Sequence, residues 1–481
     1  MRWLGKRIFV FALGFLFFSL LMGIPVDSPA AKADHWAKPN ASMDLSKFPD
    51  MSDFDPNNPV VPHGDTIKIA LVAPFSGPAA INGNLYFVSI QWVAQGINKN
   101  GGIWVDGKKK MVEIIKADTK SSPDATKKIC ERMVLQEKVH MLMGTPGSHL
   151  MKIVNQVAQK YNVISVCFSS NSETLQDATN FSRNAFMTTF STSQAGKGLA
   201  YYYGKIRKKE KKFYILCQDY SFGRELAAGF KQGLKEYYPE AEIVGEDYHR
   251  LFLTDFAPFL TKIKASGAEV IFTGDWLPDG GTLLKQSRHM GVNLPFANIF
   301  ITDPVGLTEL GVEGTEGLVN FCQSGAKNPA FKNEVDIKYS TMWHDLWKNK
   351  WQAPYNSIIY EWPLGDIAFW IEQTFWTLSV IERAKSMDPE KIINVWEGDT
   401  YKYNSGKVVK MRACDHKVIQ SFHVYEYVRP DKQKVCMNIP PYYWSKDRSA
   451  AGPVHVIPAE AVLPWMDPKL DRCKGKNNWG E

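Results

Sequence analysis

Serine and histidine stand next to each other at Ser148 and His149, and in a hydrolase such a pair would act as nucleophile and general base. Adjacent residues at the start of a helix point in different directions, so His149 is badly placed to take the Ser148 proton. Neither a G-x-S-x-G nor an H-E-x-x-H motif occurs, and Gly196-Lys197-Gly198 lacks the spacing of a phosphate-binding loop. We therefore predict a protein that is not an enzyme and that binds no cofactor.

The cysteines and histidines show no spacing that is typical of a metal site. None of the seven cysteines is paired as C-x-x-C, and the ten histidines are scattered along the chain. The odd number of cysteines leaves at least one of them unpaired. The expected disulfide joins Cys436 to Cys473, which bracket a weakly patterned tail, although other connectivities stay open. No metal is expected.

Polar loops rich in hydroxyl groups and glycine follow three of the expected strands. These loops are Pro74–Pro78, Gly144–Ser148 and Phe168–Asn171. In open α/β sheets, ligands bind beyond the carboxyl ends of the strands, where loops lead into helix N-termini. Hydroxyl groups and free N–H groups at helix starts suit a carboxylate, which also gains from the helix dipole. The loops therefore predict a site for a small ligand that carries a carboxylate.

Short apolar runs alternate with longer segments of helical period. Strands are expected at 67–73, 111–117, 140–143, 162–167, 213–217, 269–273 and 297–301, and helices at 79–99, 123–137, 148–160, 194–208, 223–237, 255–266 and 280–290. Strict alternation implies parallel sheets with helices on both faces. Because Arg183–Ser191 forms an extended polar passage between two such sets, we predict two doubly wound α/β lobes. Helical stretches within 328–398 and a strand at 418–428 complete the fold.

The first 33 residues have the pattern of a cleavable secretory signal peptide, with an uncleaved anchor as the alternative. Residues 34–65 are polar and rich in proline, which indicates a linker. No later segment resembles a membrane span. The signal pattern consists of Arg2, Lys6 and Arg7, the apolar run Ile8–Ile24 and the small-x-small site Ala31-Lys32-Ala33.

The charge balance favours no polyanionic partner. The formal net charge of +7 falls to +4 when residues 1–33 are removed, which leaves 53 basic and 49 acidic residues. The basic run Lys205–Lys212 suits a solvated helix end, where cations are stabilised. We therefore expect no nucleic-acid partner, and export would place the protein in the periplasm.

Taken together, several segments resemble the type I periplasmic binding proteins of the branched-chain amino acid (Leu/Ile/Val) transport family. The resemblance runs from about residue 66 to residue 428 and rests on the order and spacing of its motifs. The matching segments are Ile67–Pro78, Ile97–Ile103, Ala117–Pro123, Gly144–Ser148, Asp219–Gly223, Asp255–Ala268, Glu316–Leu318 and Asp415-His416.

The resemblance implies two Rossmann-like lobes joined by a three-strand hinge, with crossings near residues 190, 320 and 400. Lobe 1 is then 66–189 with 321–400, and lobe 2 is 190–320 with 401–428. Residues 429–481 are expected to form an ordered, aromatic-anchored extension on the surface of one lobe. The family also implies a monomeric, extracytoplasmic component of an ABC importer. Such a protein closes around an amino acid, amide or carboxylate and delivers it to a membrane permease.

The binding residues follow from this resemblance by position. In lobe 1, Ser148 and either Ser169 or Ser170 would bind a ligand carboxylate. In lobe 2, Phe222 would pack on the ligand, and Asp275, Trp276 and Asp303 would complete that side, where an aspartate could receive an ammonium group. Alternatively, Phe222 and Trp276 are core aromatics and Asp303 only caps a turn.

Departures from the family pattern leave the ligand open. Asn82, included among the expected ligand-binding residues, precedes Gly83 where the family often has an aromatic residue. Phe222 stands where tyrosine is usual, and the loop Thr145–His149 replaces a pair of serines. The ligand is therefore not restricted to a branched-chain amino acid. A ligand-sensing subunit that docks on a membrane receptor would use the same lobes, and the sequence leaves this alternative open.

Overall fold

The computed structural model describes residues 36, 39–41, 48–276, 278–302, 304–323, 342, 346, 350–355, 366–429 and 450–481. The expected signal peptide, Asp303 and Cys436 lie outside these residues, as do residues 34, 35, 37, 38 and 42–47 of the expected linker. All that follows concerns the unit Trp36–Glu481. Among the helices of the described ranges, none combines the length and the apolar character that crossing a membrane requires.

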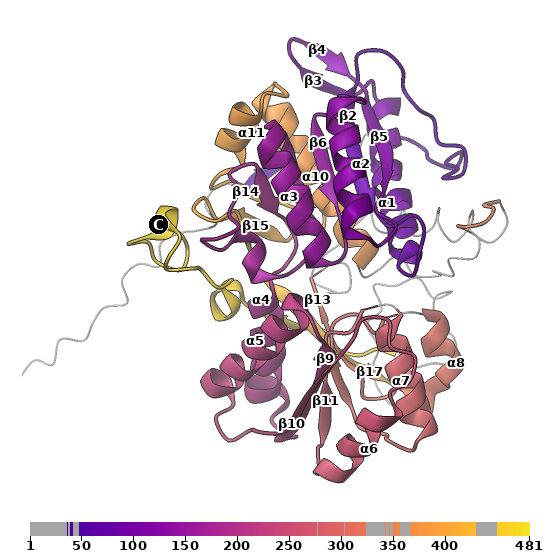
Figure 1. Cartoon of the computed structure of the whole chain (residues 1–481), viewed down its shortest axis with the longest axis vertical. Coiled ribbons are helices and arrows are strands. Elements are labelled where there is room, and N and C mark those ends of the chain that lie inside the picture. Colours follow the sequence, from indigo (N-terminus) through magenta and orange to yellow (C-terminus); the bar gives the residue numbers. More distant parts are fainter. Residues whose placement is uncertain are drawn as a thin grey trace, which may run out of the picture. The chain divides into compact units, whose positions relative to one another are not determined.

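Lobe 1 is built on a five-stranded parallel sheet with helices on both faces (Figure 1). Alternate residues of the interior strand β2 enter different cores, as a period of two requires. Ile69 and Leu71 pack with α1 and α10, whereas Ala70 and Val72 pack with α2 and α3. In spatial order the strands are β5 (Val112–Asp118), β2 (Ile67–Ala73), β6 (Met141–Gly144), β7 (Ile164–Cys167) and β8 (Ala185–Met187). The helices are α1 (Ala80–Lys99), α2 (Pro123–Leu135), α3 (Ser148–Tyr161), α10 (Asp366–Ala384) and α11 (Pro389–Trp396).

Lobe 2 contains an eight-stranded mixed sheet, also covered on both faces. Ile215 of its strand β9 packs with α4 and α5, and Leu216 packs with α6 and α7. The strands run β10 (Glu242–His249), β9 (Lys212–Gln218), β11 (Val270–Phe272), β12 (Phe296–Asn298), β13 (Val319–Cys322), β17 (Phe422–Val428) and β18 (Ala450–Ala451), with β19 (His455–Ile457) also on β17. The helices are α4 (Thr192–Tyr201), the π-helix η3 (Tyr202–Arg207), α5 (Ser221–Tyr237), α6 (Ala257–Ser266), α7 (Asp279–His289) and α8 (Pro304–Thr315).

Two smaller sheets complete the described secondary structure. One consists of β1 (Asn40–Ala41), β14 (Thr400–Lys402), β15 (Val408–Met411) and β16 (Val418–Gln420), and it packs on the core of lobe 1. The other is the hairpin of β3 (Ile103–Val105) and β4 (Lys108–Lys110). Three short 3-10 helices, η2 (Glu173–Gln176), η5 (Ala459–Val462) and η6 (Asp471–Cys473), follow loops.

The chain passes between the two large sheets after β8, after β13 and between β16 and β17. These passages are tied to one another by buried side chains. Gln323 Oε1 accepts a hydrogen bond from Phe190 N at 3.1 Å, so the first two passages are joined. The Lys407 ammonium donates to Gln323 O at 2.5 Å and to Gln420 Oε1 at 2.6 Å, which joins the second passage to the third.

The expected fold class is confirmed, while several element boundaries differ. The expected strand 418–428 is two strands, β16 and β17, separated at Ser421 where the chain changes sheet. The expected helix 194–208 consists of α4 followed by η3. Strand β10 was not expected, because most of its residues are only half-buried and its sequence Glu242–His249 lacks an apolar run. An edge strand of this kind gives a weak sequence signal.

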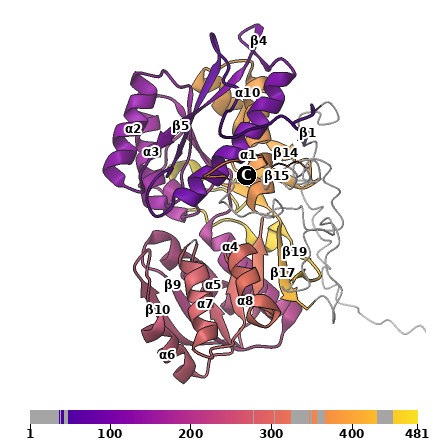
Figure 2. The same cartoon turned by 90° about the vertical axis from the view of Figure 1, so that its right-hand side faces the viewer.

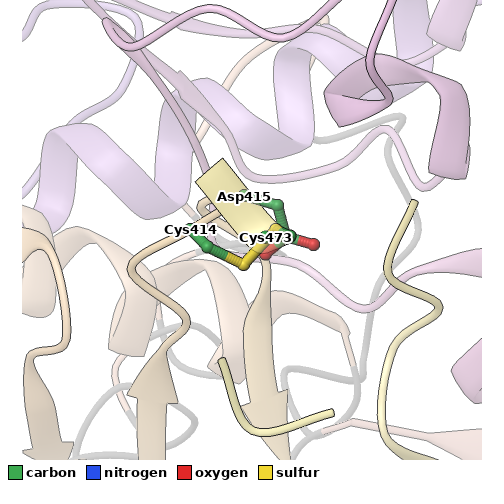
Figure 3. Close-up of side chains that lie close together, drawn as sticks. All are labelled: Cys414, Asp415 and Cys473. Carbon is green, nitrogen blue, oxygen red and sulfur yellow. A yellow bond between two sulfur atoms is a disulfide. The ribbon is translucent and has the colours of Figure 1, made fainter. Parts of the chain in front are cut away.

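The expected disulfide partner of Cys473 was wrong. Cys473 is bonded to Cys414, with a Cα–Cα distance of 5.2 Å (Figure 3). Cys414 lies in the turn between β15 and β16, and only the folded path of the chain brings the tail to this turn. The prediction that the tail lies on one lobe was also incomplete, since residues 450–481 contact both lobes. Four further cysteines are buried, namely Cys130, Cys167, Cys217 and Cys322.

Candidate functional site

The carboxyl end of β6 places Ser148 at the first position of α3. Gly147, with a φ of 85°, forms the N-cap and turns the loop into the helix. The Ser148 hydroxyl is almost fully buried and accepts a hydrogen bond from Ser172 N at 3.3 Å. Its oxygen thus connects the loop after β6 to the loop after β7. Ser148 lies where the sequence predicted, and it also positions the neighbouring loop.

Ser169 and Ser170, the two alternatives in the loop after β7, have different surroundings. Ser170 is buried, and its hydroxyl donates to Thr145 O, which ties its loop to the loop after β6. Ser169 is half-buried, and its Oγ has no hydrogen-bond partner among the described residues. A buried hydroxyl without a partner is unfavourable unless a ligand or water satisfies it. Ser169 is therefore the better candidate for a ligand contact.

Asn82 lies in the first turn of α1, beside the loop that follows β2. The side chain is half-buried, and its Nδ2 donates weakly to Ala79 O at 3.4 Å. Asp118, at the end of β5, holds the same loop by accepting from Phe75 N at 2.9 Å and from Ser76 Oγ at 2.6 Å. Burial favours the neutral form of Asp118, but these hydrogen bonds outweigh burial and lower the pKa of its carboxyl. The loop is thus held by an ionised group.

In lobe 2, the residue that the sequence assigned to ligand packing belongs to the core. Phe222 is the second residue of α5, is 2% exposed and lies within the main apolar cluster of the lobe. Tyr220, two residues earlier, is half-buried, and its hydroxyl accepts a hydrogen bond from Trp276 Nε1 at 3.0 Å. Tyr220 and the half-buried Trp276 therefore form an aromatic pair that is more accessible than Phe222. The motif Asp219–Gly223 contained Tyr220, but its local pattern did not show which ring is accessible.

Asp275 is completely buried and is already engaged within lobe 2. Its Oδ2 lies 2.7 Å from His249 Nε2, at the end of β10. Burial disfavours the charged form of His249, but Asp275 outweighs this effect and raises the pKa of the imidazole. Asp279, also fully buried, accepts from Gln218 Nε2 at 2.8 Å and from Phe252 N at 2.9 Å. This buried cluster supports the loop that carries Trp276. The second oxygen of Asp275, Oδ1, has no hydrogen-bond partner among the described residues. Asp303 lies outside the described residues.

Loops from the two lobes contact each other beside these residues. The rings of His149 and Tyr220 are 6.0 Å apart and meet edge to face. Glu225 of α5 accepts hydrogen bonds from lobe 1, from Ser172 Oγ at 2.7 Å and from Glu173 N at 2.6 Å. Neither Glu225 nor His149 was expected to join the lobes, because contacts between helices of different sheets leave no local sequence pattern.

The arrangement combines polar groups of lobe 1 with aromatic groups of lobe 2. Lobe 1 contributes the Ser169 hydroxyl and the N-terminus of α3, which favour an anionic group. Lobe 2 contributes the Tyr220–Trp276 pair, which suits an apolar or aromatic group. Among the described residues, Cys414, Asp415 and Cys473 form the one cluster of potential metal ligands, and its two sulfur atoms are joined in the disulfide (Figure 3).

Comparison with known proteins supports the two-lobe fold. A family model for periplasmic binding proteins matches residues 66–433. An amino acid binding protein of Pseudomonas aeruginosa is 27% identical over 261 residues, which cover 53% of this chain and 66% of the relative. The chain thus spans just under two thirds of the length of that relative.

Two solved structures share the fold at low sequence identity. The closed form of a leucine-, isoleucine-, valine-, threonine- and alanine-binding protein from Brucella ovis has a TM-score of 0.67 and 18% identity, covering 85% of this chain and 99% of its own. The second structure is a solute-binding protein of an ABC transporter from Rhodopseudomonas palustris in complex with 3,4-dihydroxybenzoic acid. It has a TM-score of 0.65 and 18% identity, and the match covers 82% of this chain and 98% of its own. Since the family model matches well over half of its length, this chain belongs to the periplasmic binding protein family.

Proposed function

We propose that the protein is the periplasmic solute-binding component of an ABC importer and that it has no catalytic activity. It binds a small organic carboxylate between the loops of its two lobes and delivers this ligand to a membrane permease. Two observations carry the proposal, the unpartnered Ser169 hydroxyl in lobe 1 and the half-buried Tyr220–Trp276 pair in lobe 2. The family membership and the solute-binding relatives support it.

The described residues favour an aromatic carboxylate over an α-amino acid. An ammonium group needs a carboxylate that is accessible and not already engaged. Asp275 is fully buried with one oxygen bound to His249, Glu225 is bound to Ser172 and Glu173, and Asp219 pairs with Arg224 at 2.7 Å. The aromatic pair of lobe 2 offers a planar ligand a stacking surface. The fold neighbour with bound 3,4-dihydroxybenzoic acid is consistent with this preference.

Binding acts through an equilibrium between open and closed lobes. A ligand that contacts both lobes only in the closed form shifts the population toward that form. Moving the equilibrium from 1:99 to 99:1 requires a preference of about 5.5 kcal/mol for the closed state. The binding free energy of a carboxylate held by hydroxyl and amide donors, together with that of a buried aromatic ring, is large enough to supply this preference.

A thermal-shift screen of residues 34–481 tests the proposal directly. The panel contains L-leucine, short amides, dicarboxylates, benzoate and 4-hydroxybenzoate, and the protein is refolded first to remove bound ligand. A ligand at 100 times its Kd stabilises the folded state by about 2.7 kcal/mol. We expect a shift with the benzoates that is lost in Ser169→Ala and kept in Ser52→Ala, a change at an exposed serine far along the chain from the site. A shift with L-leucine alone would refute the aromatic preference, and no shift with any class would refute the proposed function.

A further inference from the structure

The C-terminal segment begins as part of lobe 2. Strand β19 lies antiparallel to β17, with Phe422 opposite Ile457, and the two strands are adjacent in Figure 2. Ile457 and Val462 are fully buried in the core of lobe 2. The hydroxyl of Tyr237 on α5 donates to Ala461 O at 2.6 Å. Residues 455–462 are therefore anchored to lobe 2 by strand pairing, apolar packing and a side-chain hydrogen bond.

The same segment ends on lobe 1. The Asp467 carboxylate accepts from Ala178 N at 2.8 Å, and Arg472 Nη2 donates to Glu397 Oε1 at 2.6 Å. The disulfide then joins Cys473 to Cys414, in the small sheet that packs on the core of lobe 1. This end is thus held covalently as well as by hydrogen bonds.

Trp465 lies where the segment passes from one lobe to the other. Its backbone N–H donates to Ser193 Oγ of α4 at 2.9 Å, on the lobe 2 side. Its carbonyl accepts from Arg412 Nη2 at 3.1 Å and from Lys417 Nζ at 2.9 Å, next to the third passage of the chain. Lys417 also binds Glu173 Oε2 at 2.6 Å, so the backbone of Trp465 joins a buried network that contains residues of both lobes.

The contacts of Arg412 show that the segment is part of the folded core of the hinge region. Arg412 is fully buried, and two of its nitrogens bind Asp415. Its remaining donors are satisfied by backbone carbonyls of the segment, those of Pro464 at 2.9 Å and Asn478 at 2.8 Å in addition to that of Trp465. A buried guanidinium with unsatisfied donors is strongly unfavourable, so these carbonyls are required in the folded protein.

We propose that residues 455–481 form a strap, a fourth connection between the lobes that limits how far they can open. The strap lies beyond residue 433, where the match to the family model ends, so this restraint is additional to the three passages of the family fold. Only residues 463–466 link Val462, buried in lobe 2, to Asp467, bound to lobe 1. An extended chain spans at most about 3.6 Å per residue, so the two anchor points can separate by roughly 18 Å at most. The inference rests on the proposed function in one respect, since it takes the opening and closing of the two lobes as the motion that the strap restrains.

A distance measurement on the protein without ligand tests the strap. Spin labels are placed at the exposed positions Lys128→Cys on α2 and Ala265→Cys on α6, in a Cys436→Ser background. Cys130, Cys167, Cys217 and Cys322 are buried, which protects their thiols from labelling. A protease site inserted between Val462 and Leu463 is cleaved after folding, so that the disulfide still holds the released end on lobe 1. The control carries the same site between Asp106 and Gly107, in the turn of the β3–β4 hairpin.

Cleavage of the strap is expected to shift the interlobe distance distribution to longer values, and cleavage at the control site is expected to leave it unchanged. Superimposable distributions before and after cleavage of the strap would overturn the proposal. Because no ligand is present, this result does not depend on the thermal-shift screen. A strap that restrains opening in a protein that binds none of the panel would refute the proposed function alone.

Discussion

Arg412 and Asp415 form a fully buried ion pair with two hydrogen bonds, Nε to Oδ1 at 2.8 Å and Nη2 to Oδ2 at 2.6 Å. Both residues come from the turn between β15 and β16, close to the passage into lobe 2. The guanidinium also binds carbonyl groups of the strap. This pair therefore joins the hinge region to the C-terminal segment, and its energetics can be measured by substitution.

We expect Asp415→Ala to lower the free energy of unfolding by about 3–5 kcal/mol, because it leaves a buried guanidinium without its counter-ion. Urea unfolding followed by circular dichroism measures the change. The matched control is Asp219→Ala, which removes the exposed partner of Arg224 and should cost less than about 1 kcal/mol. Equal effects of the two substitutions would contradict the assigned role of the buried pair.

Removing the disulfide should destabilise the protein strongly. The bond joins residues 59 positions apart, and closing a loop of this length contributes about 4 kcal/mol in the chain-entropy model. The double variant Cys414→Ser, Cys473→Ser is therefore expected to melt at a lower temperature and to lose its sensitivity to reducing agent. Mass spectrometry of tryptic peptides identifies the bond independently. A Cys436–Cys473 peptide would show that the pairing is different.

The stability contributed by Asp279 is expected to depend on pH. Burial raises the pKa of its carboxyl to about 6, although the hydrogen bond from Gln218 opposes the rise. A group whose folded pKa is raised contributes stability below its unfolded pKa, near 3.8, and loses it as the pH rises through about 6. Asp279→Asn keeps an acceptor oxygen for Gln218 and Phe252 and cannot ionise. The variant should therefore be more stable than the parent protein above pH 6, by on the order of 2 kcal/mol.

Urea unfolding between pH 4 and pH 8 measures this difference, which should shrink toward pH 4, where the parent carboxyl is also protonated. The control Glu240→Gln changes an exposed carboxyl and should leave the pH profile parallel to that of the parent protein. An Asp279→Asn variant that is equally destabilised at every pH would show that Asp279 acts only as a hydrogen-bond acceptor.

Substitutions at Phe222 and Trp276 should have different effects, the first on the stability of the fold and the second on ligand binding. Phe222→Ala removes a ring that is 2% exposed in the core of lobe 2, and this should cost about 3–5 kcal/mol of stability. Trp276→Phe keeps an aromatic ring but loses the hydrogen bond to Tyr220, so it should change stability by about 1 kcal/mol and weaken the binding of 4-hydroxybenzoate. Isothermal titration calorimetry measures the affinity. Tighter or unchanged binding in Trp276→Phe would exclude Trp276 from the ligand site.

Much of the fold follows from local sequence patterns. The strand Ile67–Ala73 has the boundaries that its apolar run predicts, and α3 begins at Ser148 as expected. Strands that are buried on both faces give continuous apolar runs, so their sequence signal is strong. The half-buried edge strand Glu242–His249 gives no such run and was missed. The helix and strand periods therefore predicted two α/β lobes while leaving the edges of the sheets undefined.

The sequence by itself determined the class of fold, the polar loops at the strand ends and the positions of Ser148, Ser169 and Ser170, because short-range periodicity and turn composition are written along the chain. Only the tertiary structure decided that Ser170 is already bonded, that Tyr220 is more accessible than Phe222 and that Asp275 is buried against His249. It also decided that Cys473 pairs with Cys414 and that the tail links both lobes. Each of these relationships depends on which distant segments pack together, and burial and pairing between distant segments leave no periodic pattern in the sequence.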